Sequence, residues 1–196
     1  MFYKPKDGWC ADFIPFYENG KFYLFYLHDY RNPEVYGEGT PWRLLITEDF
    51  LHFQEIGEVI PRGSSCEQDL YVFTGSIFRE APSRYHLFYT GHNPHFPQKG
   101  KPMEGVQHAT SSDLIHWTKE PELPYFAPGQ FEADDWRDPF VFQDETGVYH
   151  MLLAARLKQG NSRRRGITAT AVSKDLFHWS SETVFYAPNE YYTHEC

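Results

Sequence analysis

The chain has 196 residues, a length that suits one domain, and its 41% hydrophobic and 18% aromatic residues are enough to fill a packed core. Its 27 acidic and 18 basic residues give a formal net charge of −9, which argues against a nucleic-acid or membrane-surface partner. A neutral, polyhydroxylated ligand would not be repelled by such a surface.

Short strand signals follow one another along the chain, and they repeat. Three successive units each contain an apolar run, then a turn signal, then an aromatic or aliphatic run. The first runs are 13–17, 77–78 and 140–142, and the second runs are 22–26, 85–89 and 149–153. No helical period of 3.6 residues persists through any unit, so the sequence predicts an all-β protein.

Each unit contains, after these runs, an Asp-x-x-His element followed by an aromatic residue. The aspartates of these elements are Asp49, Asp113 and Asp175, which are 64 and 62 residues apart. An element present in every unit cannot mark a single active site. We therefore interpret each aspartate as a turn residue, whose carboxylate accepts hydrogen bonds from backbone N–H groups two residues further on.

Repeats with about four short strands each are typical of the blades of a β-propeller. The predicted blades are approximately 9–70, 71–132 and 133–190, and residues 191–196 would begin a fourth. A solenoid of stacked strands is the alternative, although solenoid repeats are usually shorter. In a propeller the first strand of each blade lines the central channel, so equivalent positions of successive blades converge on one small volume.

Acidic residues occupy several of these converging positions. Aligned on the strand signals, Asp12, Ser76 and Asp138 are equivalent, and Glu195 stands near the next such position. Glycoside hydrolysis needs a group of this kind, with one carboxylate near the anomeric carbon and one carboxylic acid that protonates the leaving oxygen. The alternative for each of these acids is a structural role in a turn or a cap.

Several motifs resemble those of glycoside hydrolase family 32, the invertase, inulinase and levanase group, along essentially the whole chain. Trp9-Cys10-Ala11-Asp12 is similar to the first family motif, Trp-Met-Asn-Asp-Pro-Asn, whose aspartate is the nucleophile. Arg137-Asp138-Pro139 matches the Arg-Asp-Pro motif, whose aspartate stabilises the transition state. Glu195-Cys196 resembles the Glu-Cys motif, whose glutamate is the acid/base. The resemblance thus implies Asp12, Asp138 and Glu195 as the catalytic residues.

The same resemblance implies residues that bind the substrate. Trp42 resembles the tryptophan of a second substrate-side motif, and Phe73-Thr74-Gly75-Ser76 is similar to the Phe-Ser-Gly-Ser segment. The predicted substrate-binding residues are Trp9, Trp42, Thr74, Ser76 and Arg137. The first motif departs from the family, because Cys10-Ala11 replaces the residues before the aspartate and Phe13-Ile14 replaces Pro-Asn after it. This departure leaves the preferred sugar open.

The resemblance implies a five-bladed propeller with four-stranded antiparallel blades, of which this chain holds about three and the start of a fourth. It implies a retaining glycosidase that acts on β-fructofuranosides such as sucrose, fructo-oligosaccharides or fructans. Asp12 would attack the anomeric carbon, and Glu195 would protonate the leaving oxygen and later activate water. The alternatives are a related propeller glycosidase or fructosyltransferase, a non-catalytic sugar-binding module or fragment, and a propeller scaffold for a protein partner.

The expected partner is a small sugar or oligosaccharide, with no nucleic acid, membrane or cofactor. The ten histidines form no i, i+4 pair within a helical pattern, so we expect no metal site. Three irregularly spaced cysteines and the absence of an apolar targeting segment favour the cytoplasm. Three blades leave open sheet edges, so either a longer enzyme or a homo-oligomer is expected to complete the ring.

Overall fold

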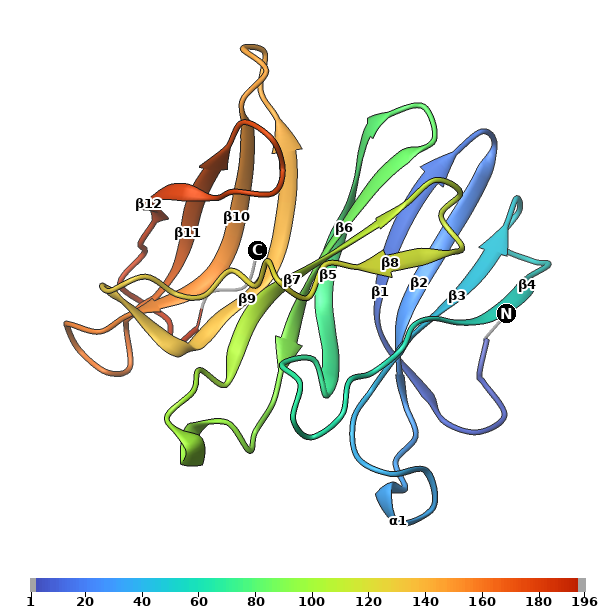
Figure 1. The fold of residues 1–196 in the computed structure, drawn as a ribbon, viewed down its shortest axis with the longest axis horizontal. Coiled ribbons are helices and arrows are strands. Elements are labelled where there is room, and N and C mark those ends of the chain that lie inside the picture. Colours follow the sequence, from blue (N-terminus) through green and yellow to red (C-terminus); the bar gives the residue numbers. More distant parts are fainter. Residues whose placement is uncertain (1–2, 194–196) are drawn as a thin grey trace.

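The structure is a computed structural model, which describes residues 3–193 and, within them, every side chain except that of Ser181. The described residues form twelve strands in three four-stranded antiparallel sheets (Figure 1). In each sheet the strands follow the chain order, so that every strand pairs with the next. The predicted all-β class with four-stranded antiparallel blades is therefore confirmed.

The strands of the three sheets have the following bounds. The first sheet comprises β1 (Trp9–Glu18), β2 (Lys21–Asp29), β3 (Trp42–Thr47) and β4 (Gln54–Ile60). The second comprises β5 (Tyr71–Ala81), β6 (Arg84–His92), β7 (Glu104–Ser111) and β8 (Trp117–Lys119). The third comprises β9 (Phe131–Gln143), β10 (Tyr149–Leu157), β11 (Gly166–Ser173) and β12 (Ser180–Tyr186). Two short helices, α1 (Pro33–Tyr36) and a 3₁₀ turn (Pro97–Lys99), lie in the loops.

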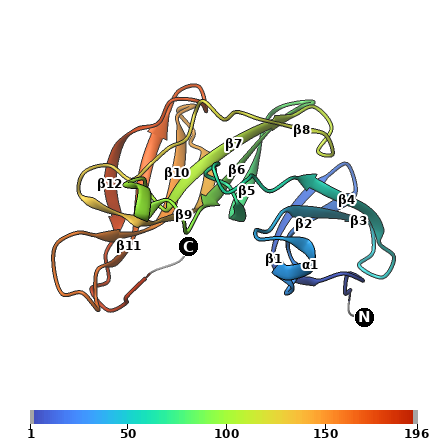
Figure 2. The same cartoon turned by 60° about the horizontal axis from the view of Figure 1, so that its bottom comes forward.

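The three sheets lie side by side like the blades of a fan, with the first and third at opposite ends (Figures 1 and 2). One apolar cluster joins the first two sheets and includes Phe25 and Leu87. A second cluster joins the last two sheets and includes Phe88 and Met151. The first strands also meet, because β5 contacts both β1 and β9. Residues on β1, β5 and β9 are thereby brought together although they are far apart in sequence.

Each of these first strands is interrupted by a β-bulge, which leaves one or two residues outside the regular ladder. The register of β1 shifts between Ala11 and Phe13, so that Asp12 is the inserted residue. The shift in β5 falls at Thr74, and the shift in β9 falls at Asp138 and Pro139. Proline lacks an N–H group to donate to a ladder, so a bulge is a position that tolerates it.

The bulges correct the predicted alignment of the three blades. The position equivalent to Asp12 and Asp138 is Thr74, two residues before the predicted Ser76. Alignment on apolar strand signals cannot detect the inserted residue of a bulge, because a bulge changes the pairing and not the hydrophobic pattern. Asp12 and Asp138 both have positive φ angles, 24° and 56°, a backbone region that non-glycine residues seldom occupy.

Candidate active site

A cavity of about 330 Å³ opens where the first strands of the three sheets meet. Its lining residues come from all three sheets and are Asp12, Leu27, Phe73, Thr74, Glu104, Arg137 and Asp138. Four residues predicted from the sequence, namely Asp12, Thr74, Arg137 and Asp138, are thus brought together. The cavity combines carboxylates, a hydroxyl and a guanidinium with two apolar walls, a composition suited to holding a small polar ligand in one orientation.

Asp12 is held by a residue of the neighbouring sheet. The Thr74 hydroxyl donates a hydrogen bond of 2.6 Å to the Oδ2 atom of Asp12. Both residues are the inserted residues of their bulges, so the bulges turn the two side chains toward each other. The bulge of β5 depends on Gly75, because a Cβ atom there would lie only 1.9 Å from the backbone oxygen of Phe88. The carboxylate of Asp12 itself belongs to an exposed residue and is open to a ligand.

Arg137 is the basic residue of the cavity, and carboxylates surround it. Its Nη1 atom donates to Asp135 at 2.7 Å and lies 3.4 Å from Glu104, and its Nε atom lies 3.8 Å from Asp138. Burial opposes the charge of the guanidinium, but the hydrogen bond to Asp135 and the nearby carboxylates raise the pKa of Arg137 above its usual range. Arg137 therefore stays charged and is fixed in position beside Asp138.

The carboxyl of Asp135, which accepts a hydrogen bond from Arg137, has a raised pKa. Burial raises the pKa of Asp135 above its ordinary value, although the hydrogen bond from Arg137 and the charge of Arg156 oppose this shift. Arg156 is almost fully buried, and its Nε atom lies 3.3 Å from Asp135. Arginines thus lie on both sides of Asp135, which anchors the strand segment that carries Asp138.

Glu104 is a cavity residue that the sequence interpretation missed. It begins β7, is only 4% exposed, and accepts a hydrogen bond from the backbone N–H of Trp136 at 3.2 Å. Its other oxygen lies 3.2 Å from Nδ1 of His92. The available signal was a charged residue at the start of the run 104–111, which is otherwise apolar or weakly polar. Such a residue is seldom fully buried unless it has partners.

Three predicted substrate-binding residues do not line this cavity. Trp42 is fully buried in the core between the first two sheets, and so it cannot contact a ligand without opening that core. Ser76 is 6% exposed, and its hydroxyl accepts the backbone N–H of Val141 at 3.1 Å, which ties β5 to β9. Trp9 is exposed, and the ammonium of Lys4 lies 4.0 Å from its ring centroid. For Trp42 and Ser76 the structure supports a packing role in place of the predicted ligand contact.

The third predicted catalytic acid, Glu195, lies outside the described residues. Its position relative to Asp12 and Asp138 stays a prediction. Within residues 3–193, no three His, Cys, Asp or Glu side chains gather in a way that could hold a metal ion. No helix in the same range is long and apolar enough to cross a membrane.

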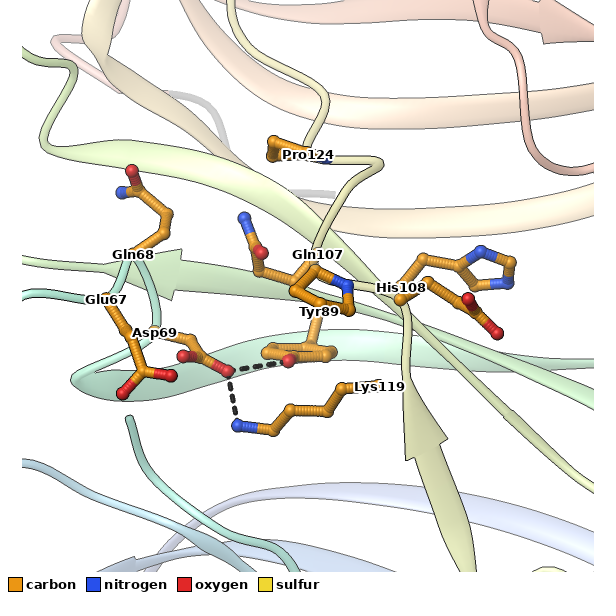
Figure 3. Close-up of a pocket in the computed structure, with 10 residues that line it drawn as sticks. Glu67, Gln68, Asp69, Tyr89, Gln107, His108, Lys119 and Pro124 are labelled. Atoms are coloured by element: carbon orange, nitrogen blue, oxygen red, sulfur yellow. Dashed lines mark hydrogen bonds and ion pairs between the residues drawn. The ribbon is translucent and has the colours of Figure 1, made fainter. Parts of the chain in front are cut away.

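A second cavity, of about 200 Å³, lies on the second sheet near β8 (Figure 3). The carboxylate of Asp69 accepts hydrogen bonds there from the hydroxyl of Tyr89 at 2.7 Å and the ammonium of Lys119 at 2.6 Å. Lys119 also donates to the backbone oxygen of Pro61, which connects the segment after β4 to β8. The central charges of this cavity are therefore already paired within the protein, and the network serves to hold the first two blades together.

A β-propeller with acidic side chains around its centre is the class of protein that this geometry defines. The family model "Glycosyl hydrolases family 32 N-terminal domain" matches residues 2–196, and the chain belongs to this family. The three sheets are three blades of the family's five-bladed propeller.

Two relatives are consistent with this family membership. A levanbiose-producing levanase of Bacillus subtilis (strain 168) is 28% identical over 163 residues, covering 79% of this chain and 30% of that protein. The sucrose-6-phosphate hydrolase of Escherichia coli is 32% identical over 111 residues, covering 55% of this chain and 22% of that protein.

A solved structure shows the same fold. Fructan 1-exohydrolase IIa of Cichorium intybus, in complex with 1-kestose, superposes with a TM-score of 0.72 at 20% identity. The superposition covers 91% of this chain and 32% of that one. The chain therefore spans less than a third of the length of each of these three proteins.

Proposed function

We propose that this chain forms the nucleophile side of a retaining glycosidase that cleaves β-fructofuranosides. The observation that carries the proposal is the meeting of Asp12, Thr74, Arg137 and Asp138 around one cavity of about 330 Å³. Two of these residues are aspartates on bulges of different blades, with unusual positive φ angles. Such backbone conformations cost free energy and persist at sites where a side chain has to be aimed.

In the proposed reaction, Asp12 attacks the anomeric carbon and forms a covalent fructosyl-enzyme. The hydrogen bond from Thr74 orients the attacking carboxylate and leaves its other oxygen available to the substrate. Glu195 protonates the leaving oxygen and then, as a base, activates the water that resolves the intermediate.

Asp138 and Arg137 are proposed to hold hydroxyl groups of the sugar ring. Arg137 keeps its charge because carboxylates surround it, and it restrains the neighbouring Asp138. A carboxylate that accepts a sugar hydroxyl bonds it more strongly when positive charge develops on the ring. The interaction then stabilises the transition state more than the bound substrate, which is the condition for acceleration.

Neutral fructosides are the proposed substrate class. The described wall of the cavity contains three carboxylates and one guanidinium, and the chain as a whole carries a net charge of −9. An acidic cavity repels anions and accepts polyhydroxylated neutral sugars. This favours sucrose, fructo-oligosaccharides and levan over phosphorylated sugars.

The homo-oligomer predicted from the sequence remains part of the proposal. Large apolar side chains are exposed on the outer sheets, among them Phe13 of the first sheet at 48% and Phe140 of the third at 54%. Exposed apolar side chains of this kind gain free energy when another surface covers them. Sedimentation of the purified chain tests this expectation, and a monomer at all concentrations would contradict it.

The direct test is fructose release by the purified chain from sucrose, short fructo-oligosaccharides and levan, with Glu195→Gln as the paired variant. We expect release that the variant abolishes, with sugar affinity largely kept. Saturable sugar binding without release would point to a sugar-binding module. Neither binding nor release would contradict the proposed function.

A further inference from the structure

We propose that Thr90 is a positioning residue that fixes the Asp12 and Asp138 carboxylates relative to each other. The inference rests on the proposed function and adds a residue that does not line the cavity described above. Thr90 lies on β6, the second strand of the middle blade, and its side chain is completely buried. It acts through neighbouring backbone groups and makes no contact with the ligand.

The hydroxyl of Thr90 makes two hydrogen bonds to two different bulges. The backbone N–H of Asp138 donates to its Oγ1 atom at 2.8 Å. The same hydroxyl donates to the backbone oxygen of Thr74 at 3.1 Å. One side chain therefore connects the bulge of the third blade to the bulge of the second blade.

The backbone groups on either side of the Thr90 hydroxyl fix which atom donates and which accepts in each hydrogen bond. A backbone N–H can only donate and a backbone carbonyl can only accept, so the group between them has to accept and donate at once. A hydroxyl does this, whereas the methyl group of valine, although close in shape, does neither. Thr90 is also β-branched, so few rotamers compete with the one that makes both bonds.

The connection continues into the first blade. The side chain of Thr74, whose backbone oxygen is held by Thr90, donates its own hydrogen bond to Asp12 at 2.6 Å. A continuous path of hydrogen bonds thus runs from Asp138 through Thr90 and Thr74 to Asp12, across three blades. The backbone N–H of Val141 on β9 also donates to the hydroxyl of Ser76 on β5, but this bond lies beyond the bulges.

These hydrogen bonds affect catalysis because they orient the two carboxylates, which packing alone would not do. Asp12 and Asp138 stand where the register of their strands shifts, so the bonds made by Thr90 and Thr74 help to set the directions of these two side chains. Reacting groups have to be held to within a fraction of an ångström, and a misplacement of about 1 Å costs a rate on the order of 100-fold.

The test compares Thr90→Val, Thr90→Ser and the control Thr40→Val in the 196-residue chain. Thr40 is also buried, at 9% exposure, but its hydroxyl has no hydrogen-bond partner among the described residues. We expect Thr90→Val to lower kcat for fructose release by about 10- to 100-fold while KM changes little. Thr90→Ser should restore most of the rate, and Thr40→Val should leave it unchanged.

A second readout does not depend on turnover. Amide hydrogen exchange at Asp138 and the carboxyl ¹³C chemical shift of Asp12, both measured by NMR, should change in Thr90→Val and stay near wild type in Thr40→Val. If the wild-type chain neither binds nor cleaves fructosides, the proposed function fails, and these two signals still decide whether Thr90 positions the carboxylates. If Thr90→Val does not fold, Thr90→Cys replaces it, since its thiol bonds only weakly. Signals that match those of Thr40→Val would overturn the inference.

Discussion

Two features recur in every blade, an outer turn and an inner bulge, and they recur in different ways. In the outer turn the side chains are conserved from blade to blade, and so are their contacts. The distances from His Nδ1 to Asp Oδ2 in the pairs Asp49–His52, Asp113–His116 and Asp175–His178 are 2.7, 2.7 and 2.8 Å. In the inner bulge the register shift repeats but the side chains differ, as Asp12, Thr74 and Asp138.

The contacts of the two kinds of aspartate explain the contrast. In the first outer turn, Asp49 accepts hydrogen bonds from the His52 side chain and from the N–H groups of His52 and Leu51, all within its own turn. These bonds lower the pKa of Asp49, with the bond from the His52 side chain as the largest cause. Asp12 instead accepts its hydrogen bond from another blade. A side chain that repeats with its turn serves the architecture, and one that varies at a fixed backbone position is available for function.

The two kinds of aspartate are distinguished most directly by replacing one of each kind by asparagine. Asp12→Asn removes the proposed nucleophile, so we expect fructose release to fall by about 1000-fold or more while thermal stability is kept. Asp113→Asn, in the outer turn of the second blade, should leave the rate within about 2-fold of wild type, since no substrate reaches it. Equal losses in the two variants would contradict the assignment.

The backbone of the bulge can be tested apart from its side chains. Gly75→Ala places a Cβ atom 1.9 Å from the backbone oxygen of Phe88, so β5 has to move away from β6. We expect a loss of about 2–3 kcal/mol in the free energy of unfolding by urea, as for other overpacked sites. Gly129→Ala is the matched control, because no heavy atom lies within 4 Å of its Cβ position. A similar loss in both variants would show that the bulge does not require glycine.

Much of the fold could be predicted from the sequence because its signals are local. Alternating apolar runs and turn residues define strands, and the Asp-x-x-His elements show the period of the blades. The convergence of Asp12 and Asp138 followed from that period together with the position of the first strand in each blade. Family motifs added Thr74 and Arg137 to the site, and the structure places both at the cavity.

The remaining part of the site depends on pairing between strands, which a sequence pattern does not contain. A bulge changes the register without changing the apolar pattern, so the pattern predicts Ser76 at the position where the structure has Thr74. Trp42 resembles the tryptophan of a family motif, but its burial depends on which faces of the first two sheets pack together. Glu104 was missed because its partners, Trp136 and Arg137, lie on another blade.

A buried histidine makes the stability of the protein depend on pH. His108 is buried against His86, and burial, with a smaller effect of His86, lowers the pKa of His108 to about 3. The unfolded chain, with a histidine pKa near 6.5, therefore binds a proton first as the pH falls. The contribution of the uncharged His108 to the free energy of unfolding is fully present above about pH 6.5. It decreases toward pH 3, by about 2 kcal/mol between pH 7 and pH 5. His108→Gln should flatten this dependence in urea titrations.

The matched control is His116→Gln, which removes the exposed histidine of an outer turn. We expect the pH dependence between pH 7 and pH 5 to stay as steep as in the wild-type protein. A flattening in His116→Gln as large as that in His108→Gln would mean that burial is not the cause.

The smallest expected effect lies in the outer turn itself. Asp175 accepts the backbone N–H groups of Phe177 and His178 at 2.9 and 2.8 Å, and Leu176, directly after Asp175, has a positive φ of 67°. Asp175→Ala removes both bonds, so we expect a loss of about 1 kcal/mol in unfolding free energy, with fructose release unchanged.

The backbone N–H of His178, followed by its side chain, lowers the pKa of Asp175. The contribution of this carboxylate is therefore present above about pH 4 and is lost as the pH falls further. His178→Ala removes only an exposed ring and should cost a few tenths of a kcal/mol, about the value of a surface ion pair. If His178→Ala cost more than Asp175→Ala, the ring pair would hold the turn, and the backbone bonds would not be what makes this aspartate recur in every blade.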